Sequence, residues 1–228
     1  MGYNKEDRDL KTYLVTGGTG FIGSALAIKL LKEGNKVVVF DNNERGKSLR
    51  LFKYKKKIKF IKGDIRNFDE INKAMKNIDV VCHLAYINGT KFFYKKPEKV
   101  IEIAIKGIIN VIDCCINNKI KNLILASSSE VYQDPEKIPT SEKERLIIPD
   151  IYNPRYSYGG GKILTELMGI IYGKKYFKKL IIFRPHNVYG PDMGNEHVIP
   201  EFFNKIFKLT KSRNKNLTLE IQGSGLET

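Results

Sequence analysis

The chain alternates short apolar runs with longer segments in which apolar residues recur every three or four positions. The short runs are typical of buried β-strands and the longer segments of amphipathic helices. Strands are predicted at residues 12–16, 36–40, 58–62, 79–85, 122–127 and 180–184. Helices are predicted at 21–33, 44–54, 68–76, 97–118 and 156–173, with a further helix near 199–210. Strands that alternate with helices favour an α/β fold with a doubly wound parallel sheet and helices on both faces.

A glycine-rich turn separates the first predicted strand from the first predicted helix, in TYLVTGGTGFIG (12–23). Gly18, Gly20 and Gly23 fit the spacing G-x-G-x-x-G, whereas Gly17, Gly20 and Gly23 fit G-x-x-G-x-x-G. Between a strand and a helix, this spacing indicates a Rossmann-type dinucleotide site. Glycines let the backbone approach a pyrophosphate, and the helix N-terminus offers N–H donors. A plain glycine-rich turn is the alternative.

Acidic residues follow the second and third predicted strands. Asp41 lies just over twenty residues after the glycine turn, where a carboxylate accepts hydrogen bonds from an adenosine ribose and repels a 2′-phosphate. The expected cofactor is therefore NAD, although the nearby Arg45 and Lys47 would suit the phosphate of NADP. Asp64 is a candidate to meet the adenine amino group. The alternative role is a helix or turn cap for Asp41 and an N-cap-like role before the helix at 68 for Asp64.

The segment YSYGGGK (156–162) places three glycines in the first turn of a predicted helix. A glycine inside a helix costs up to about 1 kcal/mol relative to alanine, so something is expected to require bare backbone there. That requirement is either close approach of a ligand or a tightly packed helix pair. Tyr158 and Lys162 share one helix face, and an ammonium beside a phenol stabilises the phenolate, which makes Tyr158 a candidate base. Serines at 127–129 end the fifth predicted strand and offer hydroxyls for the reacting oxygen.

Composition narrows the choice of partners. The 228 residues contain no run of eighteen apolar residues and begin with a charged segment, so a cytoplasmic protein without a membrane span is expected. Cys82, Cys114 and Cys115 lack the spacing of metal ligands, so neither a metal site nor a disulfide framework is predicted. The formal net charge is +15, but the lysines are dispersed, which argues against nucleic acid as the main partner. A positive surface would still attract a diphosphate ligand.

The chain resembles the extended short-chain dehydrogenase/reductase superfamily, specifically its NAD-dependent nucleotide-sugar epimerases and dehydratases. The matching stretches, in the family's order, are TGGTGFIG (16–23), Asp41, GDIRN (63–67), HLA (83–85), SSSEVY (127–132), Tyr158 with Lys162, and RPHNVYGP (184–191). The resemblance implies an NAD-binding Rossmann domain over residues 1–190. Residues 191–228 would begin a sugar-binding lobe that is incomplete, because family members usually continue further, so the sequence is expected to be truncated.

The resemblance also implies roles for individual residues. Ser128 would polarise the sugar oxygen, Tyr158 would remove a proton from a sugar hydroxyl, expected at C4, and Lys162 would lower the tyrosine pKa and bind the nicotinamide ribose. Cofactor contacts are implied for Gly17, Gly20, Phe21, Ile22, Gly23, Asp41, Asn42, Asp64, Ile65, Leu84, Ala85, Tyr158, Lys162 and Pro185. Contacts with a nucleotide-diphosphate sugar are implied for Ser128, Ser129 and Asn187. A homodimer is expected through the helices at 97–118 and 156–173.

An epimerase is the first expectation, and two other functions stay open. A 4-epimerase needs little beyond Ser128, Tyr158 and Lys162. A 4,6-dehydratase or a uronic-acid decarboxylase begins with the same oxidation, and the dehydratase then needs a carboxylate to take the C5 proton. Glu130 stands where those relatives carry such an acid, but their usual Asp-Glu pair is Ser129-Glu130 here, which favours the epimerase. The third alternative is an NAD-binding remnant without turnover.

Three positions depart from the family pattern. Tyr86 stands where the family often has a small residue after HLA, and it would narrow the nicotinamide pocket. Ala104 stands where many relatives have an asparagine, and Gln133 replaces the usual glycine after VY.

Overall fold

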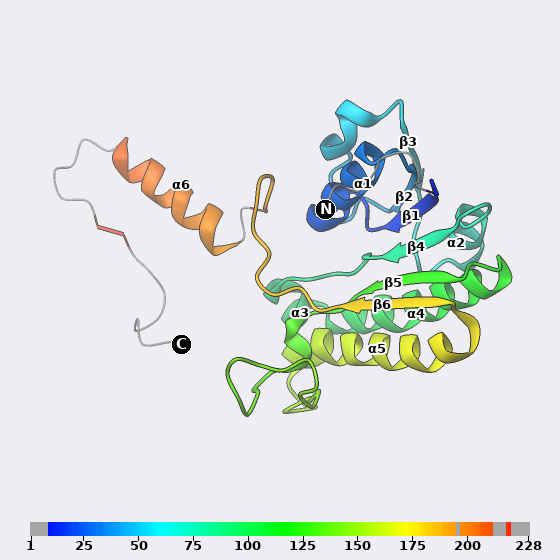
Figure 1. The fold of residues 1–228 in the computed structure, drawn as a ribbon. Coiled ribbons are helices and arrows are strands. Elements are labelled where there is room, and N and C mark those ends of the chain that lie inside the picture. Colours follow the sequence, from blue (N-terminus) through cyan, green and yellow to red (C-terminus); the bar gives the residue numbers. More distant parts are fainter. Residues whose placement is uncertain (1–8, 195–196, 212–217, 220–228) are drawn as a thin grey trace, which may run out of the picture. The chain divides into compact units, whose positions relative to one another are not determined.

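Figure 1 shows a computed structural model of the chain, which describes residues 9–194, 197–211 and 218–219. One six-stranded parallel sheet has the order β3-β2-β1-β4-β5-β6. Its strands are β1 (Thr12–Thr16), β2 (Lys36–Asp41), β3 (Ile58–Lys62), β4 (Val80–His83), β5 (Asn122–Ala126) and β6 (Lys179–Phe183). The chain winds from the central β1 to one edge, returns with β4 and then winds to the other edge. The predicted doubly wound, Rossmann-type α/β fold is confirmed.

Helices connect the strands. They are α1 (Phe21–Lys32), α2 (Phe68–Ala74), α3 (Thr90–Lys95), α4 (Pro97–Asn117), α5 (Ser157–Tyr176) and α6 (Val198–Thr210). Short 3-10 turns are η2 (Ser48–Tyr54), η3 (Ser129–Val131) and η4 (Pro154–Tyr156). The helix predicted at 44–54 is thus a 3-10 segment. Helix α3 was not predicted, because six residues are too few to show a helical repeat of apolar positions.

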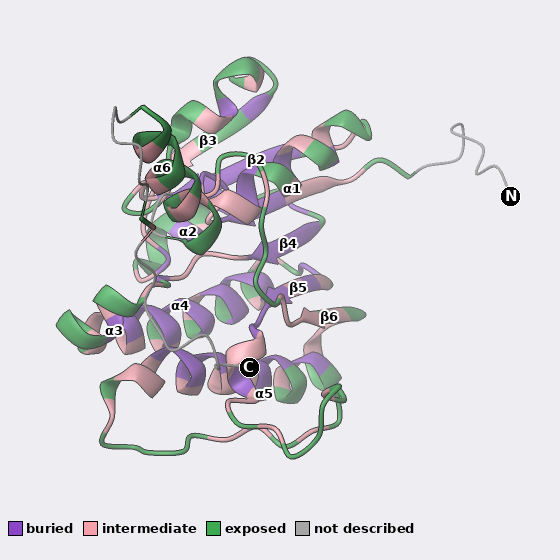
Figure 2. Cartoon of the chain, turned by 90° about the vertical axis from the view of Figure 1, so that its left-hand side faces the viewer, coloured by how far each residue is buried: buried purple, intermediate pink, exposed green. Residues whose placement is uncertain are grey.

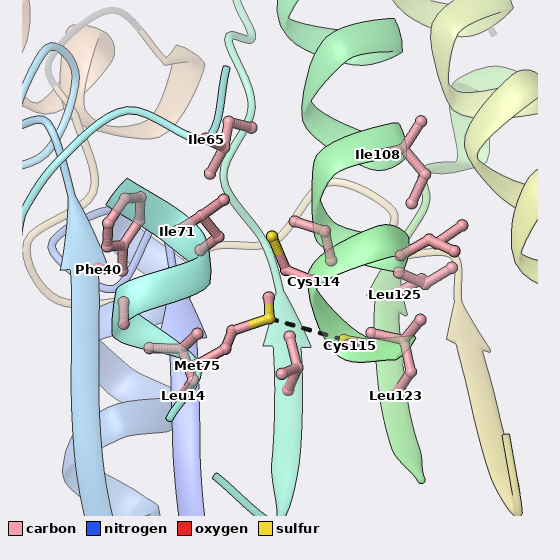
Figure 3. Close-up of a cluster of buried hydrophobic side chains, with 14 of the residues drawn as sticks. Leu14, Phe40, Ile65, Ile71, Met75, Ile108, Cys114, Cys115, Leu123 and Leu125 are labelled. Carbon is pink, nitrogen blue, oxygen red and sulfur yellow. Dashed lines mark hydrogen bonds between the residues drawn. The ribbon is translucent and has the colours of Figure 1, made fainter. Parts of the chain in front are cut away.

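The two faces of the sheet carry separate cores. Because successive residues of a strand point to opposite faces, Leu14 and Val15 are both fully buried but belong to different cores. The larger core packs β-strand residues against α2 and α4, and Figure 3 shows Phe40, Ile71 and Leu123 within it. The second core packs strand residues against α1 and η2. Figure 2 shows that the buried residues follow the central strands β2, β1, β4 and β5 and the inward side of α4, whereas the edge strand β6 has no buried residue.

The chain divides into two compact units after His186. The first unit contains the whole sheet, and the second includes α6, which confirms the helix predicted near 199–210. The predicted start of a sugar-binding lobe at 191–228 lies partly outside the described residues, and the domain boundary at 190 stays a prediction. None of the helices in the described ranges combines the length and apolar character needed to cross a lipid bilayer.

Candidate functional site

The predicted site residues gather at one edge of the sheet, because the carboxyl ends of parallel strands lie together. Residues of this set follow each of the six strands: Gly17 after β1, Asp41 and Asn42 at the end of β2, Asp64 and Ile65 after β3, Leu84 and Ala85 after β4, Ser128 to Glu130 after β5, and Pro185 after β6. The backbone N–H of Ser129 donates to the carbonyl of Pro185 at 3.1 Å, which joins the last two groups. Asn187 begins the second unit, and its role stays a prediction.

The glycine turn is tight and leaves α1 without a cap. Gly17 has a φ of +68°, and a Cβ there would lie 2.7 Å from the backbone nitrogen of Ala85. A Cβ on Gly23 would lie 2.1 Å from the carbonyl oxygen of Gly17. Helix α1 starts after Gly20 with no acidic residue in its first turn, and no side chain in the described part of the chain caps it. The N–H groups near Phe21 and Ile22 therefore suit an external anion.

Asp41 ties β2 to the glycine turn. One carboxylate oxygen accepts a hydrogen bond from the backbone N–H of Thr19 at 3.0 Å, and the other accepts from the N–H of Asn43 at 2.8 Å. Asp41 is buried, so this position holds a carboxylate in a fixed orientation beside the turn. These bonds match the turn-stabilising alternative, and a role in ribose binding stays a prediction.

Asp64 is held by an ion pair. Arg66 donates to both carboxylate oxygens at 2.7 and 3.0 Å, which lowers the pKa of Asp64 to about 2. Asn42 donates a further hydrogen bond to Asp64 at 3.2 Å. The interpretation of Asp64 as a helix cap is wrong, because the Asn67 side chain accepts from the first backbone N–H groups of α2. A contact with adenine stays a prediction.

Tyr158 lies in the first turn of α5 and is only 7% exposed. Its ring stacks on Phe93, with centroids 5.3 Å apart, and meets Tyr86 edge to face at 5.1 Å. Burial raises the pKa of Tyr158 and the negative charge of Glu130 adds to this, while a hydrogen bond with Ser128 lowers the pKa. The structure thus brings together the predicted serine and tyrosine.

Lys162 lies one turn further along α5 and is 4% exposed. Its ammonium donates to the Ala126 carbonyl at the end of β5 at 2.7 Å. The Nζ atom lies over the Tyr86 ring, 4.0 Å from the centroid, and 5.8 Å from that of Tyr158. Burial lowers the pKa of Lys162 from 10.5 to about 7, and the nearby Glu166 carboxylate opposes this shift. The lysine therefore changes charge near neutral pH.

His83 has a structural role. Its Nδ1 atom pairs with the hydroxyl of Thr16 at 2.8 Å, and the ring is buried. Burial, together with the charge of Lys162, lowers the pKa of His83 to about 3. The imidazole is therefore neutral and holds β4 to β1.

Packing within the protein accounts for two of the three glycines in α5. A Cβ on Gly159 would lie 2.6 Å from the Gln133 amide nitrogen. A Cβ on Gly161 would lie 2.1 Å from the Tyr86 hydroxyl oxygen and 2.7 Å from the Cβ of Ala104 on α4. The contact of Gly161 with α4 supports the alternative of a tightly packed helix pair, whereas Gly159 packs against the segment that follows η3. Close approach of a ligand to this turn stays a prediction.

Gln133 explains why a glycine is usual after VY. Its φ is +52°, a backbone conformation that favours glycine. The Gln133 side-chain amide donates to the carbonyl of Glu130, and this bond closes the turn around the unfavourable residue.

A cavity of about 570 Å³ adjoins the Ser128–Tyr158 pair through residues that follow Ser128. Its polar lining includes Ser129, Glu130, Arg155 and His186. The Glu130 side chain is 43% exposed and lies 3.7 Å from the Arg155 guanidinium. His186 Nδ1 lies 2.7 Å from the Ser129 hydroxyl. The charged groups of Glu130 and Arg155 and the hydroxyl of Ser129 thus line a cavity beside Tyr158, where a polar ligand could contact them.

A buried ion pair that the sequence analysis missed supports this cavity. Arg184 donates to both carboxylate oxygens of Glu166 at 2.8 and 2.6 Å, and Glu166 is 2% exposed. The same guanidinium donates to the Tyr132 hydroxyl at 2.6 Å and to the Glu142 carbonyl at 3.0 Å. One signal was present in the sequence, because Glu166 repeats the four-residue spacing of Tyr158 and Lys162.

Comparison with known proteins places this geometry in a family. A family model described as "NAD dependent epimerase/dehydratase family" matches residues 13–227. A dTDP-D-glucose 4,6-dehydratase of Dictyostelium discoideum is 32% identical over 99% of this chain and 53% of its own length. A UDP-N-acetyl-alpha-D-glucosaminuronate decarboxylase of Bacillus cytotoxicus is 35% identical over 84% of this chain and 60% of its own length.

Solved structures agree with the sequence relatives. A UDP-N-acetylglucosamine 4-epimerase of Methanobrevibacter ruminantium M1, in complex with UDP-N-acetylmuramic acid, superposes with a TM-score of 0.79 at 30% identity. The match covers 88% of this chain and 64% of that protein. The chain thus spans little more than half the length of the curated relatives, 53% and 60%.

Proposed function

Because the chain belongs to the NAD-dependent epimerase/dehydratase family, we propose that it is a nucleotide-sugar epimerase that transiently oxidises its sugar at C4. The observation that carries the proposal is the cluster formed by Ser128, Tyr158 and Lys162 at the carboxyl edge of the sheet. A hydroxyl, a buried phenol and a buried amine are the groups that such an oxidation requires.

The residues present fit NAD. The glycine turn and the uncapped N-terminus of α1 suit a pyrophosphate, and the fixed carboxylate of Asp41 suits a ribose. When bound, NAD supplies a hydride acceptor that takes the hydride from the sugar and returns it. The cofactor contacts expected at Leu84, Ala85 and Pro185 follow from their positions after β4 and β6.

In the proposed reaction the chain moves one proton. The Ser128 hydroxyl orients the reacting sugar oxygen, and the Tyr158 Oη atom takes the proton from that oxygen. Burial raises the pKa of Tyr158, so the phenolate requires positive charge nearby, which the protonated Lys162 supplies. Tyr158 gives the proton back when the alcohol is restored on the opposite face of the sugar.

A nucleotide-diphosphate sugar is the proposed substrate, since the names of the relatives described above all refer to UDP- or dTDP-linked sugars. The cavity beside Ser129 offers charged and hydroxyl groups for a polar sugar. We also propose a homodimer through α4 and α5.

A dehydratase or decarboxylase is the second candidate, and Glu130 favours it. The carboxylate is 43% exposed, lines the cavity and lies two residues after Ser128, so it is accessible to take a sugar proton. Sequence similarity to the dehydratase and the decarboxylase supports the same candidate.

The test begins with the purified protein, scanned for NAD(H) by absorbance and mass spectrometry. The protein is then incubated with UDP-, GDP- and dTDP-sugars, and the products are analysed by mass spectrometry and NMR. A product of unchanged mass supports the epimerase, whereas loss of water or carbon dioxide replaces it with the second candidate. Glu130→Gln is expected to retain epimerase turnover, and Tyr158→Phe to abolish it. Bound NAD without turnover of any sugar would support the remnant.

A further inference from the structure

Tyr86 occupies an unusual position beside the proposed catalytic pair. It lies three residues after the end of β4, and its ring contacts both members of the pair, the Lys162 ammonium through its face and the Tyr158 ring edge to face. Its hydroxyl oxygen is buried and has no hydrogen-bond partner among the described residues. A buried hydroxyl without a partner is unfavourable. The favourable contacts of Tyr86 are therefore those of its aromatic ring.

The space for this ring comes from two small residues on two helices. A Cβ on Gly161 would lie only 2.1 Å from the Tyr86 hydroxyl oxygen and 2.7 Å from the Cβ of Ala104. Tyr86 and Ala104 were singled out in the sequence as departures from the family pattern. Both residues lie against Gly161, so the large aromatic side chain sits where α5 carries a glycine and α4 an alanine.

We propose that Tyr86 is a positioning residue for the catalytic pair, whose ring holds the Lys162 ammonium and the Tyr158 phenol in place. The inference rests on the proposed function for the roles of Lys162 and Tyr158. The contact with the ammonium is a cation–π interaction, which is strongest where water is excluded, as it is around this buried lysine.

The Tyr86 ring stabilises the ammonium form of Lys162 and so offsets part of the cost of burying that charge. On α5, Glu166 favours the ammonium, and Tyr158 faces it as a neutral phenol. From β4, the neutral His83 faces it, and from β5 only the Ala126 carbonyl is in hydrogen-bond contact. Among the described residues, the negative face of the Tyr86 ring thus joins Glu166 and the Ala126 carbonyl in stabilising the charged form of Lys162.

The test compares Tyr86→Phe with Tyr86→Leu. The first keeps the ring and removes the orphaned hydroxyl, and the second removes the ring. The pKa of Lys162 is read by NMR titration of protein carrying ¹³C at the lysine ε-carbon, with the resonance assigned by its loss in Lys162→Arg. We expect Tyr86→Leu to lower that pKa by about one unit and Tyr86→Phe to leave it within about 0.3 units.

Turnover supplies the second readout. At pH 7.5 a fall of about one unit in the lysine pKa predicts a roughly tenfold lower kcat for Tyr86→Leu with little change in KM. Tyr86→Phe is expected to retain turnover within about twofold. Tyr94→Leu is the control, because Tyr94 is an exposed residue of α3.

The outcomes separate the two proposals. A Lys162 pKa that is unchanged in Tyr86→Leu overturns the inference, and a pKa that rises shows that Tyr86 only excludes water. A lowered pKa in a protein that turns over no sugar supports the contact with Lys162 and rejects the proposed function.

Discussion

The ammonium group of Lys162 is buried, and burial disfavours the charged form of a lysine. The residue is almost fully buried, and the nearest fixed partner of its ammonium is a backbone carbonyl instead of a carboxylate. Most of the lysines in the described ranges are exposed, so that water solvates their charge. A buried lysine that serves the proposed chemistry is therefore expected to lower the stability of the fold.

Lys162→Met is expected to stabilise the protein while abolishing turnover. The unfolded chain keeps the lysine proton up to about pH 10.5 and the folded chain loses it near its pKa of about 7. Between these values the unfolded state binds more protons, so wild-type stability rises with pH. Lys162→Met has no ionisable group at this position, so its stability lacks this dependence on pH. Its advantage in the free energy of unfolding is expected to be about 2–3 kcal/mol at pH 6, after the loss of the carbonyl contact, and to shrink towards pH 10.

Urea unfolding at pH 6, 8 and 9.5 measures this difference. Lys174→Met is the control, because that lysine lies in the exposed last turn of α5. An advantage that is equal at all three pH values would contradict the assignment of a lowered pKa to Lys162.

The adjacent glycines of α5 are expected to respond oppositely to alanine. At Gly161 the new Cβ meets the buried hydroxyl of Tyr86 and the buried Ala104, so the free energy of unfolding is expected to fall by about 1–3 kcal/mol. At Gly160 the new Cβ meets only the flexible end of Ile148 at 3.1 Å. The gain in helix propensity, up to about 1 kcal/mol, is then retained. Thermal denaturation of both variants checks the contrast, and equal effects would exclude the packing explanation.

At the scale of elements, one ion pair joins helix, strand and loop. Arg184, which directly follows β6, binds Glu166 of α5, the Tyr132 hydroxyl after η3 and the carbonyl of Glu142. The loop at 133–153 is thus fixed through its Glu142 carbonyl to the layer that carries Lys162. The single guanidinium of Arg184 bonds at once to the Glu166 carboxylate of α5, the Tyr132 hydroxyl and the Glu142 carbonyl, and it thereby fixes the cavity wall relative to α5.

Arg184→Met is expected to release this loop. Hydrogen bonds to charged groups contribute about 1.5–3 kcal/mol each, so thermolysin, which does not require a basic residue, should cut within 133–153 roughly tenfold faster. The single variant also leaves the Glu166 carboxylate buried without its partner, which lowers global stability by about 3 kcal/mol. Replacing both residues, in Arg184→Met with Glu166→Met, should restore most of the global stability while the loop stays released.

Arg145→Met is the matched control, because Arg145 pairs with Glu136 in the same loop but both side chains are exposed. Such a pair contributes little, so cleavage should match that of the wild type. Equal cleavage rates in Arg145→Met and Arg184→Met would mean that the ion pair with Glu166 does not anchor the loop.

The elements themselves were largely predictable, and the contacts between them were not. Strands at 12–16 and 58–62 agree with the structure to the residue, because compact apolar runs bounded by polar residues leave little freedom in assignment. The cluster of Ser128, Tyr158 and Lys162 was expected from spacing and resemblance. The pairing of Arg184 with Glu166, and of Tyr86 with Gly161, joins residues far apart in sequence. The four-residue spacing places Glu166 on the helix face of Lys162, but no local pattern identifies the partner that either contact joins to α5.

At the scale of the whole molecule, α5 presents an apolar stripe. Leu167, Ile170 and Ile171 are 52%, 44% and 57% exposed and share one helix face, and Ile109 of the neighbouring α4 is 39% exposed. The proposed homodimer would cover these residues. A stripe of this kind on a long helix suits association with a second copy around a two-fold axis.

Leu167→Glu is expected to weaken the dimer by roughly a hundredfold or more, because a two-fold interface would bury two unpaired carboxylates. Sedimentation velocity over a range of protein concentrations measures the change. Ile151→Glu adds the same charge at an 83% exposed loop residue and should leave association unchanged. A wild-type chain that stays monomeric at all concentrations would refute the proposed dimer.

The contact of Tyr86 with Gly161 also restricts the order in which this region can evolve. A side chain at 161 clashes for as long as the tyrosine is present, so the tyrosine has to become smaller before position 161 can gain a Cβ. Ala104 limits that second step as well, because its own Cβ lies 2.7 Å from the new atom. Descendants of this chain are therefore expected to keep the bulky residue and the glycine together, or to lose the bulky residue first.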